Sequence, residues 1–441
     1  MENTFGIDDI AFKAPSLYLP IQDLAEQRGI DPNKLTKGLG LTNMSMCDVD
    51  EDIVTLSAAS VIKLLQQNPD IKPEDIGRIY VGTESSIDGA KPIGTYIHQL
   101  VSDYFEAQHV DTSKMKHVDV IDMTFACIGA VDAMHNSLYY LYAEPDKVAI
   151  VVAADIANYD LASPGEYTQG AGALSVLLKK NPSLVQVGKK WGTSVKSEHD
   201  FFKPIRYQMQ NNEIIELHDE KPVFDGQFSN DTYQNRITEA WEQFSTEESL
   251  SDYEQLLFHL PYAYHGRRII SSIKQKELVE QGTFETVCKE NDIDPNDEQV
   301  SRLFGKTPYY KNWVKETIAA GDRLSSEMGN LYTASIFLSL LSYCTSSQIA
   351  EGNTVLFFAY GSGSKAKVFE GTIAAGFAAK AALWRVDEVL AQRKQVTFDE
   401  YISLRAKKVE TPLSEQNEII QVASGVSPTN KFERTYTFKS K

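Results

Sequence analysis

The stretch from Val118 to Met134 contains the residue of this chain best suited to nucleophilic chemistry, Cys127. A β-branched run passes a polar corner at 122–124, and from Cys127 onward small and apolar residues recur at helical spacing. We therefore expect a strand, a tight turn and a helix, with Cys127 in the first turn of that helix. The positive end of the helix dipole and its unpaired N–H groups would favour thiolate over thiol. A buried structural cysteine is the competing interpretation.

Three further polar residues are expected where strands end or helices begin. Glu84 follows a buried strand, His259 lies near the end of the strand 255–261, and Asn330 precedes the buried helix 331–343. Such positions are where α/β folds build their sites. A thiol, an imidazole and an amide suit thioester chemistry, which needs a nucleophile and donors to the carbonyl oxygen. Each residue also has a structural interpretation, as a core histidine or as a capping or solvated acid.

The sequence indicates neither a metal site nor a phosphate-binding loop. The four cysteines lie far apart without a CxxC pair, which argues against a zinc site and against a disulfide framework. The segment from His259 to His265 does not have the HExxH pattern of a metalloprotease. The stretch Gly361–Ser364, which contains Ser362, lacks the lysine and the spacing of a P-loop. We expect it to be a turn.

Composition excludes several classes of function. The 441 residues carry a formal net charge of −18, which argues against nucleic acid or an anionic membrane as the main partner. The N-terminus is acidic and lacks the basic and apolar regions of a signal peptide. The longest apolar run, 148–154, is too short to span a bilayer. We therefore expect a soluble, cytoplasmic protein.

Buried strands alternate with helices along most of the chain, which favours an α/β fold with a parallel sheet and helices on its faces. We expect a strand followed by a loop within 6–19, and strands near 79–83, 118–122, 147–154, 174–178, 255–261, 353–359 and 367–376. We expect helices near 21–28, 53–67, 93–104, 127–134 and 331–343, and a further helix start at Asp31-Pro32, an N-cap acid with proline at the first helical position.

The chain divides into two coarsely similar halves, each with buried strands, a glycine-rich turn and a helix of small residues. We place the halves at 1–180 and 181–410. The polar, aromatic segment 181–250 is expected to form inserted loops, because proline and Asp-Gly punctuate it. Residues 411–441 are polar and are expected to form a peripheral tail.

Seven motifs occur in the order found in one enzyme family. They are Val81–Asp88 with Glu84, Ala126-Cys127, Tyr167–Ala173, Pro222–Gly226, Phe258–Pro261 with His259, Gly329–Ser335 and Tyr360–Gly363. In this order the chain resembles the 3-hydroxy-3-methylglutaryl-CoA (HMG-CoA) synthases from about residue 5 to residue 376. None of the motifs is decisive alone, but seven in register are hard to reach by chance.

The resemblance implies a thiolase-like fold of two similar halves packed as five αβαβα layers, in a homodimer. It also implies that Cys127 takes the acetyl group from acetyl-CoA and that Glu84 is the general acid/base. His259, helped by Asn330, would hold the carbonyl of acetoacetyl-CoA, with Ser362 in the same pocket. Water would release the product, and no cofactor would be required.

Six further positions match or depart from the family pattern. Thr168, Ser229 and Asp31 match positions that line the path of the substrate and CoA. Two family lysines that approach CoA align with Tyr264 and Arg268. Arg268 keeps the positive charge in a planar fork suited to phosphate, whereas Tyr264 does not. Two residues before the cysteine the family commonly has an acidic or amide residue, and here that residue is Phe125.

Three functions remain open at this stage. The first is HMG-CoA synthesis from free acetoacetyl-CoA in the mevalonate pathway of isoprenoid biosynthesis. The second is polyketide β-branching, in which the β-ketoacyl acceptor is bound to an acyl carrier protein. The third is a catalytically inactive scaffold. The presence of Cys127, Glu84 and His259 argues against the scaffold, and the net charge of −18 argues against an acidic carrier protein as partner.

Overall fold

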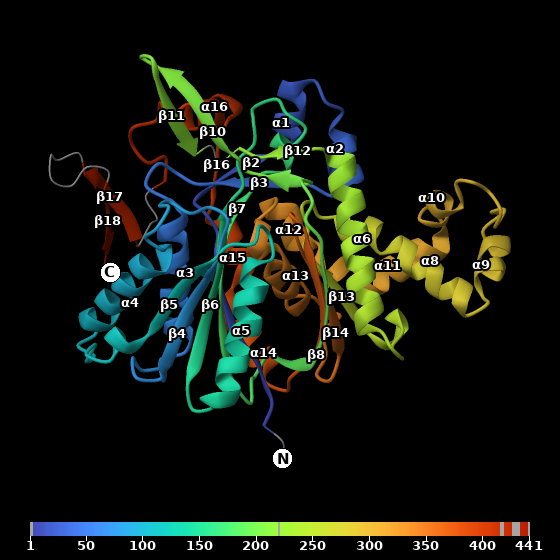
Figure 1. Ribbon diagram of the computed structural model, residues 1–441, viewed down its shortest axis with the longest axis horizontal. Coiled ribbons are helices and arrows are strands. Elements are labelled where there is room, and N and C mark those ends of the chain that lie inside the picture. Colours follow the sequence, from blue (N-terminus) through green and yellow to red (C-terminus); the bar gives the residue numbers. More distant parts are fainter. Residues whose placement is uncertain (1–2, 219–220, 415–418, 426–432, 440–441) are drawn as a thin grey trace.

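A computed structural model describes residues 3–218, 221–414, 419–425 and 433–439 of the chain (Figure 1). Its largest element is a mixed sheet with strand order β13-β14-β15-β8-β1-β7-β6-β4-β5. These strands are β1 (Phe5–Lys13), β4 (Ile76–Gly82), β5 (Asp119–Met123), β6 (Val148–Ile156), β7 (Ala171–Lys180), β8 (Val185–Val195), β13 (Gln255–Phe258), β14 (Thr354–Gly361) and β15 (Lys365–Ile373).

A narrow junction divides this sheet into two parts. Strands β1 and β8 pair only where Gly6 faces Gln186 and Ile7 faces Val185. A Cβ atom at Gly6 would lie 2.1 Å from the Val185 carbonyl oxygen, so the two backbones can approach this closely only at a glycine. The first part therefore contains β1, β7, β6, β4 and β5, and the second contains β8, β15, β14 and β13.

The expected parallel sheet is confirmed only in part. Strand β4 runs parallel to both β5 and β6, and β13 runs parallel to β14. The other neighbours are antiparallel. Strands β14 and β15 must be antiparallel because the short turn at 362–364 joins them, whereas parallel strands need a long crossover.

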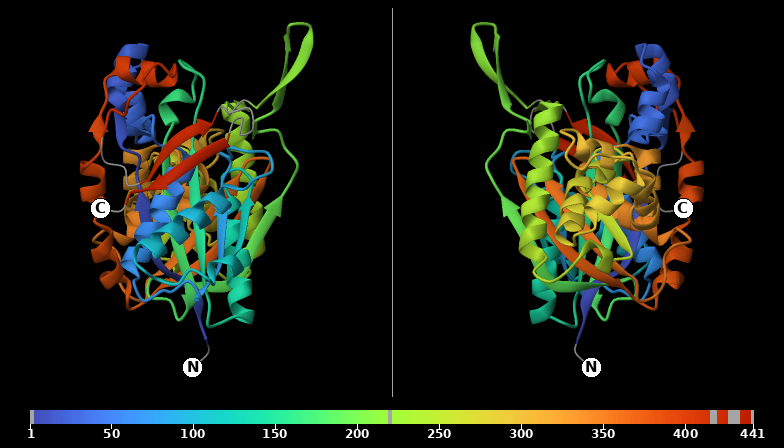
Figure 2. Two further views of the ribbon diagram at one scale, coloured as in Figure 1. Left: turned by 90° about the vertical axis from the view of Figure 1, so that its left-hand side faces the viewer. Right: turned by 90° about the vertical axis from the view of Figure 1, so that its right-hand side faces the viewer.

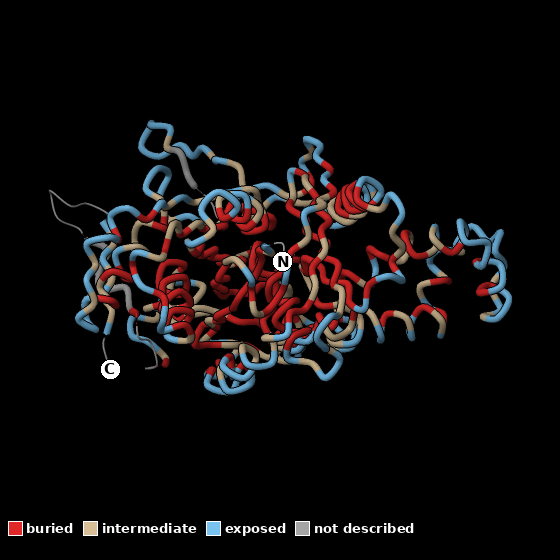
Figure 3. The backbone as a smooth tube through the Cα atoms, turned by 90° about the horizontal axis from the view of Figure 1, so that it is seen from below, coloured by how far each residue is buried: buried red, intermediate tan, exposed pale blue. Residues whose placement is uncertain are grey.

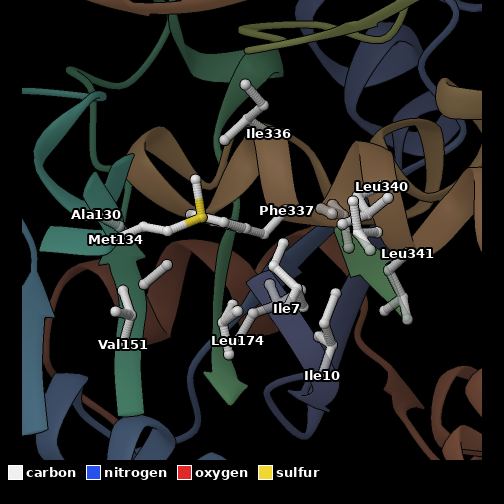
Figure 4. Close-up of a cluster of buried hydrophobic side chains, with 14 of the residues drawn as sticks. Ile7, Ile10, Ala130, Met134, Val151, Leu174, Ile336, Phe337, Leu340 and Leu341 are labelled. Carbon is white, nitrogen blue, oxygen red and sulfur yellow. The ribbon is translucent and has the colours of Figure 1, made fainter. Parts of the chain in front are cut away.

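Two helices, α5 (Gly129–Ala143) and α13 (Ser335–Cys344), fill the space between the two parts of the sheet. Figure 4 shows Met134 of α5 and Phe337 of α13 in one buried cluster with Leu174 of β7. Every residue of α13 is buried. Even its three serines, Ser335, Ser339 and Ser342, are buried, so this mostly apolar helix lies inside the core.

Each part of the sheet also has an outer apolar face, as β6 shows. Its residues Ala149, Val151 and Ala153 belong to the central cluster, whereas Ile150 and Val152 belong to a second cluster on the opposite face. This alternation is the period-2 pattern of a strand buried on both sides. The helices that cover this second face are α3 (Ile53–Gln67) and α4 (Ile93–Ala107).

Helices also cover the outer face of the second part of the sheet, around a third apolar cluster. They are α6 (Gly226–Phe244), α7 (His265–Ile269), α8 (Ser271–Glu280), α9 (Phe284–Glu290), α10 (Val300–Phe304) and α11 (Pro308–Thr317). Helix, sheet, helix, sheet and helix thus follow one another, and the expected five layers are confirmed. Figure 3 shows the buried backbone concentrated in the middle of the molecule.

The other elements decorate these layers. They are β2 (Leu17–Pro20), α1 (Ile21–Arg28), α2 (Pro32–Leu39), β3 (Asn43–Met46), β9 (Phe201–Phe202), β10 (Ile205–Gln210), β11 (Glu213–His218), β12 (Val223–Phe224), α12 (Arg323–Met328), α14 (Phe377–Trp384), α15 (Val386–Ala391), β16 (Lys394–Gln395), α16 (Phe398–Arg405), β17 (Ile419–Gly425) and β18 (Glu433–Phe438). No helix in the described part of the chain is long and apolar enough to cross a membrane.

The expectation of inserted loops at 181–250 is wrong for much of that segment. It supplies the core strand β8 and the long helix α6, and the β10–β11 hairpin projects from the body of the molecule (Figure 2). A glycine of β8 has a packing role. A Cβ atom at Gly192 would lie 2.0 Å from the Ala240 carbonyl oxygen, so glycine lets α6 approach the strand.

The tail beyond residue 410 contributes a hairpin, β17–β18, on the side of α3 and α4. The Tyr436 hydroxyl donates to Asp52 at 2.7 Å, and the Tyr436 ring lies 5.3 Å from that of Tyr96. Residues 415–418, 426–432 and 440–441 of the expected tail lie outside the described residues.

Candidate active site

Cys127 lies on the turn that joins β5 to α5. The structure places it just before α5, which begins at Gly129, and not inside the first turn of the helix. Ile128 N–H donates to the Phe125 carbonyl at 3.0 Å, and Ala126 has a left-handed φ of 37°. A non-glycine residue in that region is strained, and such strain is concentrated at functional sites.

The Cys127 thiol faces the Glu84 carboxylate. The thiol donates to Glu84 Oε1 with a sulfur–oxygen distance of 3.3 Å. Glu84 follows β4, a neighbour of β5, so the two strand ends bring the two side chains together. On the other side of the carboxylate, Lys203 Nζ lies 3.2 Å from Glu84 Oε2. The site is thus a chain of thiol, carboxylate and ammonium groups.

The expected thiolate form of Cys127 is wrong for the resting site. Burial, followed by the Glu84 and Asp155 charges, raises the pKa of the Cys127 thiol well above its ordinary value, and Lys203 only partly opposes this. The hydrogen bond to Glu84 also requires the proton to be on sulfur. Cys127 therefore rests as a thiol that has a carboxylate in place to accept its proton.

Asp155, at the end of β6, connects the segments that carry the site. Its Oδ1 accepts from Thr83 Oγ1 at 3.0 Å, from Glu84 N at 2.8 Å and from Ser85 Oγ at 2.8 Å, and its Oδ2 accepts from Thr333 N at 3.0 Å. The Thr333 hydroxyl in turn accepts from Ala130 N at 2.8 Å, in the first turn of α5. Burial and the nearby Glu84 raise the pKa of the Asp155 carboxyl.

His259 follows β13 and is 2 % exposed. Its backbone N–H donates to the Phe358 carbonyl at 3.0 Å, and its backbone carbonyl accepts from the Tyr233 hydroxyl at 2.7 Å. These two bonds fix the backbone of His259. Burial lowers the pKa of the His259 imidazole to about 3, so the ring is neutral near pH 7. Its Nδ1 has no hydrogen-bond partner among the described residues.

A cavity of about 290 Å³ opens between these residues. Its lining includes the sequence-predicted residues Cys127, His259, Asn330, Ser362, Thr168, Ser229 and Arg268. The structure therefore brings together most of the predicted site from both halves of the chain. Glu84 lies against Cys127, outside the lining of this cavity.

Asn330 has a fixed amide group in this cavity. Its Oδ1 accepts from Tyr332 N at 2.8 Å and from Ser335 Oγ at 3.5 Å, which leaves its NH₂ group as the donor available to a ligand. Its backbone N–H donates to the Thr168 carbonyl at 2.9 Å. Asn330 and Thr168 are thus held together, although they come from different halves of the chain.

Ser362 and Ser229 are held by a shared aspartate. Asp200 Oδ1 accepts from Gly363 N at 2.8 Å, beside Ser362, and the Asp200 carbonyl accepts from Ser229 Oγ at 2.5 Å. Asp200 Oδ2 also accepts from the Tyr360 hydroxyl at 2.5 Å. Asp200 therefore orders two walls of the cavity, one through its buried carboxylate and the other through its backbone carbonyl.

The residues expected to contact CoA do not gather at one place. Arg268 is exposed at the cavity and donates to the Gly38 carbonyl at 2.8 Å and to Tyr262 Oη at 3.2 Å. Tyr264 lies outside the cavity lining and packs against Gly40 and Arg267.

Asp31 also lies outside the cavity lining, where it caps α2 by accepting from Asn33 N at 3.0 Å. This confirms the helix start expected at Asp31-Pro32 and gives Asp31 a structural role.

Phe125, which departs from the family pattern, supplies no polar group to the thiol. Its ring lies 3.9 Å from Lys365 Nζ, and Lys365 pairs with Asp132. The polarity around Cys127 instead comes from Glu84 and from residues that sequence reasoning missed.

The missed residues are Lys203, Asp155, Asp200, His265, Tyr233 and Tyr332. Asp155 had a usable signal, because it ends a fully apolar strand. Lys203 and Asp200 lie in the segment expected to be loops, so no pattern connected them to a site. Within the described residues, no group of three His, Cys, Asp or Glu side chains could hold a metal ion.

Two family models match the chain. The hydroxymethylglutaryl-coenzyme A synthase N-terminal model matches residues 1–182, and the corresponding C-terminal model matches residues 188–438. This chain belongs to the HMG-CoA synthase family. The C-terminal model extends past residue 410 and therefore includes most of the expected tail.

Relatives with the same family name are similar over nearly the whole chain. A hydroxymethylglutaryl-CoA synthase of Enterococcus faecalis is 28% identical over 437 residues, covering 98% of this chain and 99% of the relative. One of Haloferax volcanii is 29% identical, with 98% and 99% covered. The chain is thus a member of an enzyme family and spans 99% of the length of each of these two relatives.

Solved structures confirm the thiolase-like fold of this HMG-CoA synthase family member. MvaS in complex with 3-hydroxy-3-methylglutaryl coenzyme A matches with a TM-score of 0.81 and 24% identity, covering 100% of both chains. An HMG-CoA synthase complexed with CoA matches with a TM-score of 0.72 and 27% identity, covering 95% and 96%. The HMG synthase of the curacin biosynthetic pathway matches with a TM-score of 0.76 and 18% identity, covering 99% and 100%.

Proposed function

We propose that this chain condenses acetyl-CoA with acetoacetyl-CoA and water, giving HMG-CoA and CoA through an acetyl group on Cys127. The observation that carries this proposal is the 3.3 Å hydrogen bond between the Cys127 thiol and Glu84 beside a cavity that His259 also lines. The named relatives and the family models support the same reaction.

In the first step, Cys127 sulfur attacks the acetyl carbonyl carbon and the CoA sulfur leaves. Glu84 accepts the thiol proton and passes it to the departing CoA sulfur, so the step balances. Bulk water has little access to the thiol, since Cys127 is only 7 % exposed. A thiol that is deprotonated only when substrate arrives avoids a buried free charge.

In the second step, Glu84 removes a proton from the methyl group of the acetyl thioester. The resulting carbanion attacks the ketone carbon of acetoacetyl-CoA, and Glu84 returns the proton to the new alkoxide. His259 and the Asn330 amide donate hydrogen bonds to the ketone oxygen as it gains charge. A neutral imidazole suits this task, and the low pKa of His259 keeps it neutral.

In the third step, water hydrolyses the thioester to Cys127, releasing the product with a free carboxylate and restoring the thiol. No step needs a cofactor, and the reaction belongs to the mevalonate route of isoprenoid synthesis. Thr168, Ser229 and Ser362 line the acyl end of the cavity, and Arg268 at its exposed edge binds the phosphates of CoA. Tyr264 and Asp31 support α7 and α2 near that edge.

The wider organisation follows the family. The two halves, 1–180 and 181–410, each contribute one wall of the site, and 411–441 is a peripheral tail. The protein works in the cytoplasm as a homodimer and binds neither nucleic acid nor membrane. Its net charge of −18 disfavours binding of an anionic polymer, whereas a small CoA thioester can be bound by one local cation, Arg268.

The acceptor distinguishes this function from its nearest alternative, condensation on a β-ketoacyl group bound to an acyl carrier protein. The test offers acetyl-CoA together with either acetoacetyl-CoA or acetoacetyl-carrier protein and compares kcat/KM. We expect free acetoacetyl-CoA to be preferred, because a chain with a charge of −18 repels an acidic carrier protein. A preference for the carrier protein would assign the alternative function.

Glu84→Ala tests the chemical roles within the reaction. Condensation should fall about 10²–10⁴-fold, the usual contribution of a positioned acid/base. Acetylation should fall less, because removing the Glu84 charge also removes a cause of the raised Cys127 pKa. The measurement is acetyl-enzyme formation and HMG-CoA formation on the same folded variant. If both proceed at the wild-type rate, Glu84 is structural.

A further inference from the structure

Lys203 lies beside the proposed catalytic residues but has no role in the reaction steps given above. It lies between β9 and β10, at the base of the projecting β10–β11 hairpin. Its Nζ contacts Glu84 twice, at 3.2 Å from the carboxylate Oε2 and at 3.3 Å from the backbone carbonyl, to which it donates. Because Lys203 contacts both the side chain and the backbone of Glu84, it restricts the orientation of the Glu84 carboxylate.

The surroundings of Lys203 make this contact stronger than a surface ion pair. The Lys203 side chain is 17 % exposed and that of Glu84 is 6 % exposed. The Lys203 ammonium also lies 4.8 Å from the centre of the Tyr332 ring, a cation–π distance. Water screens such a pair less than an exposed one, so the charge of Lys203 acts more strongly on its neighbours.

Three acidic groups meet at this point of the structure. They are the Glu84 carboxyl, the Asp155 carboxyl, which accepts from Glu84 N at 2.8 Å, and the Cys127 thiol. Tyr159 and Tyr332 are also buried here, but burial keeps both phenols protonated by raising their pKa. Among the described residues, only Lys203 forms an ion pair with any of the three acids.

We propose that Lys203 is the positioning residue of the pair Cys127 and Glu84. It holds the Glu84 carboxylate against the Cys127 thiol, and its positive charge stabilises the ionised form of each of the three acid groups. This inference rests on the proposed function, because it assigns how Glu84 receives and returns its protons. When the thiol proton moves to Glu84, negative charge moves to sulfur, and Lys203 is the cation that offsets it.

The alternative role for Lys203 is a structural one, as an anchor that ties the β10–β11 hairpin to the body of the molecule. The two roles predict different results. An anchor affects stability and leaves proton affinities alone, whereas a shared cation changes the proton affinity of the Cys127 thiol. The deciding measurement is therefore the pH dependence of thiol reactivity in the full-length protein.

The test alkylates Cys127 with iodoacetamide across pH 6–10 and follows the peptide that contains Cys127 by mass spectrometry. Lys203→Met should slow alkylation about tenfold at pH 8, and similarly at every pH below the pKa of the thiol, because a nearby opposite charge lowers an acid's pKa by about 1–3 units. Lys203→Arg should restore most of the wild-type profile. Lys276→Met, which breaks an exposed ion pair between Lys276 on α8 and Glu242 on α6, is the matched control and should change nothing.

The same variants are then assayed for acetylation and for condensation. Lys203→Met should lower HMG-CoA formation at least tenfold, with Lys203→Arg much less affected. If Lys203→Met does not fold, Lys203→Gln, which keeps a polar chain without the charge, serves in its place. An unchanged alkylation profile in a folded neutral variant overturns the inference. If Lys203→Met slows alkylation but the wild-type protein itself makes no HMG-CoA, the role of Lys203 is supported and the proposed function is refuted, so the two failures are distinguishable.

Discussion

Replacing the buried imidazole of His265 should make the protein more resistant to acid. His265 begins α7, is 2 % exposed, and lies with its ring 4.8 Å from that of Tyr233 and 4.7 Å from that of Tyr262. Neither ring nitrogen has a hydrogen-bond partner among the described residues. Burial, followed by the nearby His259 and Arg268, lowers the pKa of His265 well below its ordinary value. Met is of similar length and has no proton to take up.

The expected size follows from proton linkage. Below pH 6.5 the unfolded chain protonates its histidine, whereas the folded chain cannot, so stability present above pH 6.5 is lost as the pH falls. For a histidine that stays neutral in the folded state, the loss is about 2 kcal/mol at pH 5 and only about 0.2 kcal/mol at pH 7. His265→Met should remove this loss, while the buried His259 keeps its own contribution.

Urea unfolding at pH 7 and pH 5 measures the effect. The wild type should lose about 2 kcal/mol more free energy of unfolding between these two pH values than His265→Met does. His117→Met is the control, because His117 is exposed to water in the folded protein. Equal losses in the wild type and His265→Met would show that the His265 ring becomes protonated in the folded state, and the reasoning would be refuted.

Three more predictions concern catalysis. Labelled acetyl-CoA should leave one label per chain on the Cys127 peptide, and Cys127→Ser should lose it, because a hydroxyl is a much weaker nucleophile; label on another cysteine would contradict this. His259→Ala should slow condensation by about 10²–10³-fold, the usual cost of one lost donor, and slow acetylation less; equal losses would mean that His259 activates the thiol. Arg268→Ala should raise KM for CoA substrates and leave kcat nearly unchanged, as loss of uniform binding does. An unchanged KM would mean that Arg268 does not contact CoA.

Local patterns predicted the helices and the buried strands well. The helix 53–67 was expected at the same bounds that the structure has, because the Asp52 side chain caps its start and Asn68-Pro69 follow its end. Strand β8 could not be found in the same way. It lies in the segment that proline and Asp-Gly led us to expect as loops, and its Gly192 is explained only by the close approach of α6 in the folded structure.

The site was predictable where motifs carry it and not where tertiary contacts do. Cys127, Glu84 and His259 were expected at strand ends or helix starts and in family motifs. The structure places Cys127 and His259 in the lining of one cavity and Glu84 against Cys127. Lys203 reaches Glu84 across 119 positions of sequence. Asp155 acts through four hydrogen bonds that no sequence spacing encodes. Such contacts depend on the assembled layers, so single-sequence patterns do not reveal them.

The protonation of Cys127 shows how magnitudes decide between two correct principles. A helix N-terminus stabilises a nearby negative charge by about 0.3–1 kcal/mol, which is less than one pKa unit. Full burial can raise the pKa of an acid by about 3–5 units, and the Glu84 and Asp155 carboxyls act in the same direction. Burial therefore exceeds the helix dipole, and the sulfur keeps its proton until a base removes it. Because Glu84 already accepts a hydrogen bond from that thiol, the carboxylate proposed as the acid/base for carbon–carbon bond formation is also placed to take the proton from the nucleophile.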